Sequence, residues 1–513
     1  MTSIREDYPL VKTEQGILRG IDLGRVLVFR GIAYAAAARF GAPEEPEAWE
    51  GIRDAYVWGS VCPTSGENRS TLYTTNRLWN KGEDCLNLNV STPALGPEQR
   101  KPVMVWIHGG GFSGGSAIAE LTTDSENLAA TGEVVVVSVN HRLGCLGFLD
   151  LRSFGGAFSQ SANAGMLDLV MALRWIRRNI EAFGGDPDRV TLFGQSGGGG
   201  KIMALMQMPS ADGLFHRAII QSGVMKIQPS WRADVSSAFG RKVAEKLGLD
   251  ERNIEQIRLV PFAQLEAAVA SARAELDPRA DFFGPHPDGE TVFDDYSVAG
   301  FRRESAKIPV LAGSCLGELA MFDPRGVRSA PFSKADLEML SGAEKLERLR
   351  QRFGEDADAI TDEMRICYPE LDILYALNVD CILRPTVLDY VRARCRAAEA
   401  PTYNYILSYL IPALEGKLPW HGSDLGFCFG NVEKSEVLQT GGAAAERVMR
   451  AMMAAWISFA ASGDPAAPEL PDWKPFTADT ENCMLFDDPC RLSPGLDQKL
   501  QQLLRRHTVS MFD

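Results

Sequence analysis

The sequence predicts an α/β protein with a mostly parallel central sheet and helices on both of its faces. Two short, densely apolar runs, 103–107 and 133–139, are typical of buried parallel strands. Between residues 166 and 180, apolar side chains recur every three or four positions, and a Gly/Pro-rich segment follows, which predicts an amphipathic helix. A further apolar run, 189–193, leads directly into a cluster of glycines. Strands that alternate with helices in this way favour a doubly covered parallel sheet.

We expect one catalytic domain over residues 1–513. Residues from about 230 to 305 and from about 325 to 400 are richer in helix-forming and charged residues. No flexible linker separates them from the rest of the chain, so we interpret both ranges as helical excursions around the sheet.

Composition restricts the classes of partner. The net charge of −14 disfavours nucleic acids and anionic membranes, because both attract Lys and Arg. The N-terminus has no apolar signal segment, and no apolar run is long enough to span a membrane, which predicts a cytoplasmic protein. Ten cysteines without CxxC spacing predict neither a metal site nor a cofactor.

A candidate nucleophile lies in the glycine cluster. Gly194, Gln195, Ser196, Gly197 and Gly198 match the pattern GxSxG between an apolar strand and a predicted helix over 201–208. This strand–turn–helix setting is that of the nucleophile elbow of α/β-hydrolases, in which a sharp turn exposes the serine oxygen. Ser196 is therefore predicted to attack a carbonyl carbon.

A second glycine-rich motif follows the strand 103–107. The sequence His-Gly-Gly-Gly-Phe at 108–112 lets the backbone approach a substrate closely and direct N–H groups towards it. An attacked ester carbonyl becomes an oxyanion, and fixed N–H donors stabilise that charge. We assign the N–H groups of Gly110, Gly111 and Gly197 to this oxyanion hole.

The base and the acid should follow Ser196 in the order acid, then histidine. His216 is too early, His286 lies in a Pro-flanked loop and His507 is near the end of the chain, so elimination favours His421. Glu318 follows the buried-strand pattern 308–312, although on the residues alone Asp323 is nearly as good a candidate for the acid.

Several segments resemble the type-B carboxylesterase and cholinesterase family of α/β-hydrolases, over about residues 10–476. These are Phe-Arg-Gly-Ile-Ala-Tyr-Ala at 29–35, Glu-Asp-Cys-Leu-Asn-Leu-Asn-Val at 83–90, Val-Ser-Val-Asn-His-Arg-Leu at 137–143, and the glycine-to-glutamate spacing from 313 to 318. The family's histidine motif matches residues 421–430. The resemblance implies a bacterial-type carboxylesterase with the triad Ser196, Glu318 and His421 and with helical insertions around an active-site gorge.

The resemblance also implies supporting residues. Ser222 matches a serine that supports the triad by hydrogen bonding, and Asp424 belongs to the histidine motif. The chain departs from the family pattern at four places: Gln195 replaces a glutamate, Gly197 an alanine, His141 a tyrosine and Leu319 a glycine. Cys62 and Cys85 match the family's first disulfide, and whether they form it here is left open.

The expected reaction is hydrolysis of a small carboxylic ester through an acyl-enzyme. The same groups can hydrolyse amides, carbamates or thioesters, and the family also contains non-catalytic binding proteins that lack the serine. The natural substrate remains open, as does the oligomeric state, for which a monomer is the default. An acyl or alcohol pocket has five candidate lining residues, although an ordinary place in the core or the gorge wall is favoured for each: Phe112, Phe282, Phe283, Phe322 and Phe427.

Overall fold

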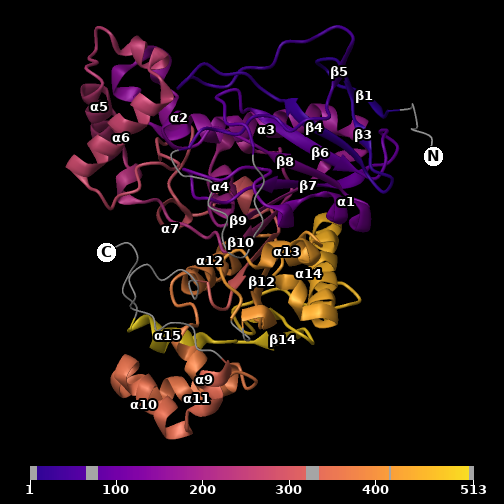
Figure 1. The fold of residues 1–513 in the computed structure, drawn as a ribbon, viewed down its shortest axis with the longest axis vertical. Coiled ribbons are helices and arrows are strands. Elements are labelled where there is room, and N and C mark those ends of the chain that lie inside the picture. Colours follow the sequence, from indigo (N-terminus) through magenta and orange to yellow (C-terminus); the bar gives the residue numbers. More distant parts are fainter. Residues whose placement is uncertain (1–7, 65–78, 319–333, 415–417, 508–513) are drawn as a thin grey trace.

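The computed structural model describes residues 8–64, 79–318, 334–414 and 418–507 (Figure 1). A large sheet runs through the molecule in the order β14-β13-β12-β11-β10-β9-β7-β8-β6-β4-β3, beside a small sheet in the order β1-β2-β5. The strands are β1 (Leu10–Lys12), β2 (Ile17–Arg19), β3 (Ile21–Asp22), β4 (Leu27–Ala33), β5 (Ile52–Asp54), β6 (Asn87–Thr92), β7 (Lys101–Ile107), β8 (Val135–Val139), β9 (Gly185–Gln195), β10 (Arg217–Gln221), β11 (Val310–Cys315), β12 (Thr402–Leu407), β13 (Asn482–Phe486) and β14 (Arg491–Pro494).

The centre of the large sheet is parallel, as the sequence predicts. All neighbours from β8 through β7 and β9 to β13 pair in parallel. Antiparallel pairs lie at the margins, where β6 joins β8 and β14 joins β13. The carboxyl ends of the parallel strands therefore meet along one edge, where open α/β sheets bind their ligands.

Helices cover both faces of this sheet. They are α1 (Glu126–Gly132), α2 (Gly144–Phe148), α3 (Ala164–Asn179), α4 (Gly197–Leu205), α5 (Ala233–Lys246), α6 (Phe262–Leu276), α7 (Tyr296–Ala299), α8 (Arg303–Ala306), α9 (Lys334–Met339), α10 (Gly342–Phe353), α11 (Ala357–Cys367), α12 (Leu383–Ala397), α13 (Asp424–Cys428), α14 (Gly442–Ser462) and α15 (Gln498–Arg505).

Alternate side chains of β7 belong to two different apolar clusters. Val105 joins the apolar cluster that contains Trp175 of α3, whereas Met104 and Trp106 join the cluster that contains Trp456 of α14. Successive side chains of a strand point to opposite faces, so α3 and α14 must cover opposite faces of the sheet.

Both helix-rich ranges of the sequence contain helices. Helices α5 and α6 lie together at one end of the molecule, and α9 to α11 lie at the opposite end (Figure 1). There Leu349 of α10, Ile360 of α11 and Leu500 of α15 belong to a third apolar cluster. Helix α12 contacts β11 and β12, so it covers the sheet. Residues 325–333 lie outside the described part of the chain.

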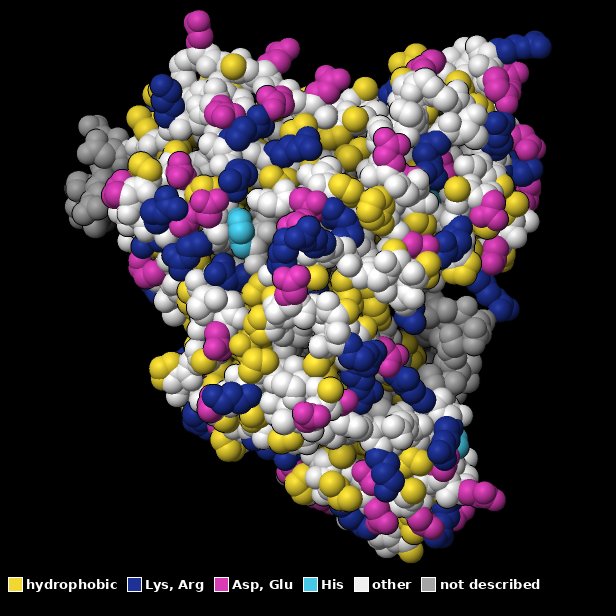
Figure 2. Space-filling model, turned by 180° about the vertical axis from the view of Figure 1, so that it is seen from behind, with side chains coloured by type: hydrophobic (Ala, Val, Ile, Leu, Met, Phe, Trp, Pro, Cys, Tyr) yellow, Lys and Arg dark blue, Asp and Glu magenta, His cyan; other side chains and the backbone are white. Residues whose placement is uncertain are grey.

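Charged side chains of both signs are interspersed over the face shown in Figure 2. Within the described residues, no helix combines the length and the apolar character that a membrane crossing requires.

Candidate active site

Ser196 lies on a sharp turn between β9 and α4. Its backbone has φ 55° and ψ −126°, a strained combination for a residue with a side chain. A Cβ added at Gly194 would lie 2.8 Å from the carbonyl oxygen of Ile107, so only glycine fits there. Such strain at a strand–helix turn is the geometry of a nucleophile elbow.

Glu318 and His421 form a charge-assisted hydrogen bond beside this turn. His421 Nδ1 lies 2.6 Å from Glu318 Oε2, and the His421 backbone N–H donates to the Glu318 carbonyl at 2.9 Å. The second carboxylate oxygen accepts from Ser222 Oγ at 2.5 Å and from the Cys315 backbone N–H at 2.7 Å. Glu318 is fully buried. Three hydrogen bonds therefore fix the carboxylate of Glu318, from His421, Ser222 and the Cys315 backbone, and the carboxylate fixes the imidazole in turn.

Of the six histidines, His421 is the one that hydrogen-bonds to Glu318. Each of the others is held by groups away from Glu318: His108 by the Gly109 carbonyl, His141 by the Arg142 carbonyl, His216 by the Val190 N–H, His286 by the carbonyls of Trp231 and Phe148, and His507 by Asp356. Asp323, the rival acid, lies outside the described residues, as does Leu319.

The charge of Glu318 controls the protonation of His421. Burial by itself would lower the pKa of His421, but the charge of Glu318 and its hydrogen bond raise that pKa above the usual value. The raised pKa makes the imidazole a better proton acceptor, which suits the predicted role of a general base.

Gln195 hydrogen-bonds to the ring nitrogen of His421 that faces away from Glu318. Gln195 Nε2 lies 3.1 Å from His421 Nε2, and no hydrogen bond joins Ser196 Oγ to His421 in the described structure. Because Nδ1 donates to Glu318, Nε2 carries a lone pair, which the Gln195 amide N–H meets as a donor. The Gln195 amide also packs 3.0 Å from the position of a Cβ on Gly109. In this arrangement the Gln195 amide, and not the Ser196 hydroxyl, is the hydrogen-bond partner of His421 Nε2.

The glycine loop lies directly over the start of α4. Gly110 and Gly111 have φ values of 87° and 61°, which favour glycine. A Cβ on Gly197 would lie 2.5 Å from Gly111 Cα, whereas a Cβ on Gly111 would meet nothing within 4 Å. The loop thus approaches Gly197 more closely than an alanine there would allow, which gives a physical reason for one departure from the family pattern.

Asp424 is buried and forms hydrogen bonds with two strands of the sheet. Its Oδ2 accepts from Gln221 Nε2 at 2.8 Å and from Tyr405 Oη at 3.1 Å, and its Oδ1 has no partner. Burial raises the pKa of Asp424 to about 6, and the charge of Glu318 adds to that effect. Its hydrogen bonds lead to β10 and β12, away from the imidazole.

The two cysteines of the possible disulfide are close but not bonded. No disulfide bond joins any of the ten cysteines, all of which lie within the described residues. A hydrogen bond with Cys62 and burial raise the pKa of Cys85. Cys62 Sγ also accepts from the Leu143 N–H at 3.2 Å.

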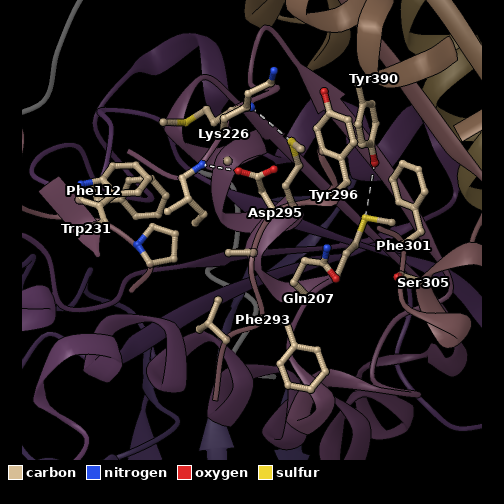
Figure 3. Close-up of a pocket in the computed structure, with 18 residues that line it drawn as sticks. Phe112, Gln207, Lys226, Trp231, Phe293, Asp295, Tyr296, Phe301, Ser305 and Tyr390 are labelled. Atoms are coloured by element: carbon tan, nitrogen blue, oxygen red, sulfur yellow. Dashed lines mark hydrogen bonds between the residues drawn. The ribbon is translucent and has the colours of Figure 1, made fainter. Parts of the chain in front are cut away.

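An apolar cavity of about 40 Å³ lies beside α4, next to the elbow (Figure 3). Phe112 and Trp231 stand on one side of it, and Tyr296, Phe301 and Tyr390 on the other. Gly200, Met203 and Ala204 of α4 also line it. A larger hollow of about 610 Å³ contains Ser113, Glu266 and Phe283. Space for apolar substrate groups therefore exists on the Phe112 side of the turn.

The five candidate phenylalanines have different places. Phe112 lines the smaller cavity and Phe283 the larger hollow. Phe282 stacks on Phe239 with ring centroids 4.1 Å apart, and Phe427 packs against Tyr409 in the core. Phe322 lies outside the described residues.

Two charged residues near the site were not anticipated from the sequence. Burial raises the pKa of Glu120, and the charge of His421 opposes that rise. Lys201, on α4, is completely buried. Lys201 could have been noticed in the sequence, because it follows four glycines at the start of a predicted helix that carries no other charge. No sequence pattern pointed to Glu120.

The sheet, the elbow and the carboxylate–histidine pair define an α/β-hydrolase. The model of the carboxylesterase family matches residues 7–509, and the chain belongs to that family. Para-nitrobenzyl esterase of Bacillus subtilis (strain 168) is 34% identical over 97% of this chain and 98% of its own. Phenmedipham hydrolase of Pseudarthrobacter oxydans is 33% identical over 94% of this chain and 95% of its own.

Solved structures agree with this assignment. An esterase from anaerobic Clostridium hathewayi, described as able to hydrolyse aliphatic aromatic polyesters, superimposes with a TM-score of 0.89. It is 38% identical and covers 98% of this chain and 99% of its own. The chain is therefore a carboxylesterase-family enzyme, and its expected fold class is confirmed.

Proposed function

We propose that this enzyme hydrolyses carboxylic esters through an acyl-enzyme on Ser196, with His421 as general base and Glu318 as its partner. The observation that carries the proposal is the 2.6 Å hydrogen bond between His421 and Glu318 beside a serine with a positive φ. This combination is what nucleophilic catalysis by a serine requires.

Attack begins when the Ser196 hydroxyl takes the place of the Gln195 amide at His421 Nε2. His421 removes the proton as Ser196 Oγ bonds to the carbonyl carbon, and the carbonyl oxygen becomes an oxyanion. The N–H groups of Gly110, Gly111 and Gly197 receive that charge. The resulting imidazolium, stabilised by Glu318, protonates the departing alcohol, and water repeats the sequence on the acyl-enzyme.

The apolar cavity beside α4 suits the acyl group of the substrate. It adjoins Phe112, which directly follows the glycine loop, and Gly200, one turn after Ser196. Most of its lining side chains are aromatic or aliphatic, although Gln207, Lys226 and Asp295 also line it, so apolar or aromatic acyl groups fit its greater part. The relative that hydrolyses aliphatic aromatic polyesters is consistent with such a preference.

Ser196→Ala tests the nucleophile. Turnover of p-nitrophenyl butyrate should fall by at least about a hundredfold, because removal of a triad member costs several orders of magnitude. Ser159→Ala, at an exposed serine, is the matched control and should retain wild-type turnover. A Ser196→Ala enzyme with native thermal unfolding and more than about a hundredth of the wild-type kcat would refute the assignment.

Ester selectivity needs a separate comparison, because the same groups can act on amides, carbamates and thioesters. Matched p-nitrophenyl esters and p-nitroanilides of the same acyl groups should be measured together. The proposal expects much higher kcat/KM for the esters. Equal or faster turnover of the anilides would instead identify an amidase.

A further inference from the structure

Lys201 is a buried charge for which the reaction described above has no role. It lies on α4, five residues after Ser196, and its side chain is completely inaccessible to solvent. Among the described residues, no carboxylate lies within salt-bridge distance of its ammonium group. An isolated buried charge is costly, so its retention calls for a reason other than stability.

The contacts of Lys201 join the two halves of the oxyanion hole. Its Nζ donates to the carbonyl oxygen of His108 at 3.0 Å and lies 5.6 Å from the centre of the Phe112 ring. His108 and Phe112 are the two ends of the glycine loop that carries Gly110 and Gly111. Helix α4 carries the third N–H donor, that of Gly197. The lysine therefore links the element that holds one donor to the loop that holds the other two.

The packing at this junction leaves little room for another arrangement. A Cβ on Gly198 would lie 3.0 Å from the same His108 carbonyl oxygen, and one on Gly200 would lie 3.5 Å from the Phe112 ring. The start of α4 thus rests directly on both ends of the loop. A shift of the loop by a few tenths of an ångström would change the distance from its donors to the oxyanion.

The titratable groups that face Lys201 are two buried imidazoles. His108 is on the loop after β7 and His141 on the loop after β8, and their rings stack with centroids 5.1 Å apart. Burial first, and then the charge of Lys201, lower the pKa of both. Arg142 acts in the same direction on His141, and α4 itself carries no other charge. The lowered pKa values favour the neutral form of both rings, and no described residue places a counter-charge beside the ammonium form of Lys201.

We propose that Lys201 is a positioning residue that holds the glycine loop against α4 and places an uncompensated positive charge beneath the oxyanion hole. This inference rests on the proposed acyl-enzyme mechanism. The ammonium acts through the His108 carbonyl and through its field, and it does not touch the substrate. Its effect should appear mainly in kcat, because the oxyanion develops only after the substrate has bound.

The buried amine of Lys201 makes the free energy of unfolding depend on pH between about 7 and 10.5. Burial lowers the pKa of Lys201 from 10.5 to about 7. Between these values the unfolded chain binds a proton that the folded protein does not, so stability rises with pH from about 7 to about 10.5. Over that window the folded enzyme loses the charge beneath the oxyanion hole, so kcat should fall while stability rises.

Lys201→Met and the exposed Lys474→Met control test the proposal. For p-nitrophenyl butyrate at pH 6, below the folded pKa of Lys201, we expect kcat of Lys201→Met to fall roughly tenfold with KM within about twofold, whereas removal of a whole donor costs a hundredfold or more. The variant should also lose the rise of its urea midpoint between pH 7 and 10. Unchanged kcat and KM in the folded variant would overturn the proposal.

Two further measurements keep the test decisive. If Lys201→Met does not fold, the wild-type enzyme serves instead. Its kcat should decline severalfold between pH 7 and 10 as the urea midpoint rises, and a kcat that does not change with pH would overturn the proposal.

Labelling of Ser196 by diisopropyl fluorophosphate separates the two proposals. No labelling of wild type refutes the acyl-enzyme mechanism, whereas equally fast labelling of wild type and Lys201→Met refutes the role of Lys201 alone.

Discussion

Gln195→Glu would place a negative charge beside the imidazole that must act as the base. The amide nitrogen of Gln195 is 3.1 Å from His421 Nε2, so a carboxylate oxygen at the same place would meet the protonated imidazole directly. Even with the dielectric constant of water, two unit charges at this distance attract by about 1.3 kcal/mol. That energy corresponds to about one pKa unit.

The sign of the effect follows from the mechanism. A nearby carboxylate favours the imidazolium and raises the pKa of His421, which Glu318 already raises. Since the free enzyme needs neutral His421, the acid limb of kcat/KM should move to higher pH by about one unit in Gln195→Glu. At a pH below that limb the variant should be about tenfold slower than wild type, and it should favour cationic esters over neutral ones of the same shape.

Gln195→Met is the matched control, because it removes the amide without adding a charge. Its acid limb should stay within a few tenths of a pH unit of wild type. The assay is a pH–rate profile of all three enzymes at fixed ionic strength with one neutral p-nitrophenyl ester. An acid limb that stays in place or moves to lower pH in Gln195→Glu would show that this side chain does not sense His421 in solution.

Three other changes have defined outcomes. Gly197→Ala, the residue usual in the family, should lower kcat severalfold and reduce the melting temperature, because its Cβ would lie 2.5 Å from Gly111 Cα; unaltered values would mean that the loop moves freely. Ala204→Leu should fill the cavity beside α4 and lower kcat/KM for benzoate and octanoate esters far more than for acetate; a uniform loss would place the acyl group elsewhere. The pKa of Asp424 is about 6 in the folded protein, against an ordinary value of 3.8, so wild type loses stability as pH rises between these two values. Asp424→Asn lacks this titration and should gain up to about 3 kcal/mol of stability relative to wild type as pH rises from 4 to 7. Parallel stability curves of the two proteins would contradict this.

The sequence predicted the elements that local patterns determine. The strand–glycine–helix pattern around Ser196 and the apolar run before Glu318 depend on residues close together in the chain, and both appear as β9 with α4 and as β11. The boundaries were less well predicted. Strand β9 begins at Gly185 instead of 189 because Gly185 pairs with Lys101 of β7, a contact that no local pattern contains.

The contacts that tune the site could not be predicted from the sequence. The approach of Gln195 to His421 joins residues that are 226 positions apart, and the burial of Lys201 depends on a loop that precedes it by almost a hundred residues. The motifs identify which groups are present, but hydrogen-bond geometry and burial depend on how distant segments pack. Gln195, Gly197, His141 and Lys201 all lie around the glycine loop, so these four unusual residues form one region that only the fold brings together.

The most direct test of the account is to identify the covalent intermediate. The enzyme should be mixed with p-nitrophenyl butyrate, quenched in acid within the first turnovers, digested and analysed by mass spectrometry. The account predicts a butyryl group on Ser196 and a stoichiometric burst of p-nitrophenol in wild type. In Glu318→Gln, which leaves the serine in place, the adduct should form orders of magnitude more slowly. An adduct on another residue, or steady turnover with neither a burst nor an adduct on Ser196 under conditions that trap acyl-enzymes, would contradict it.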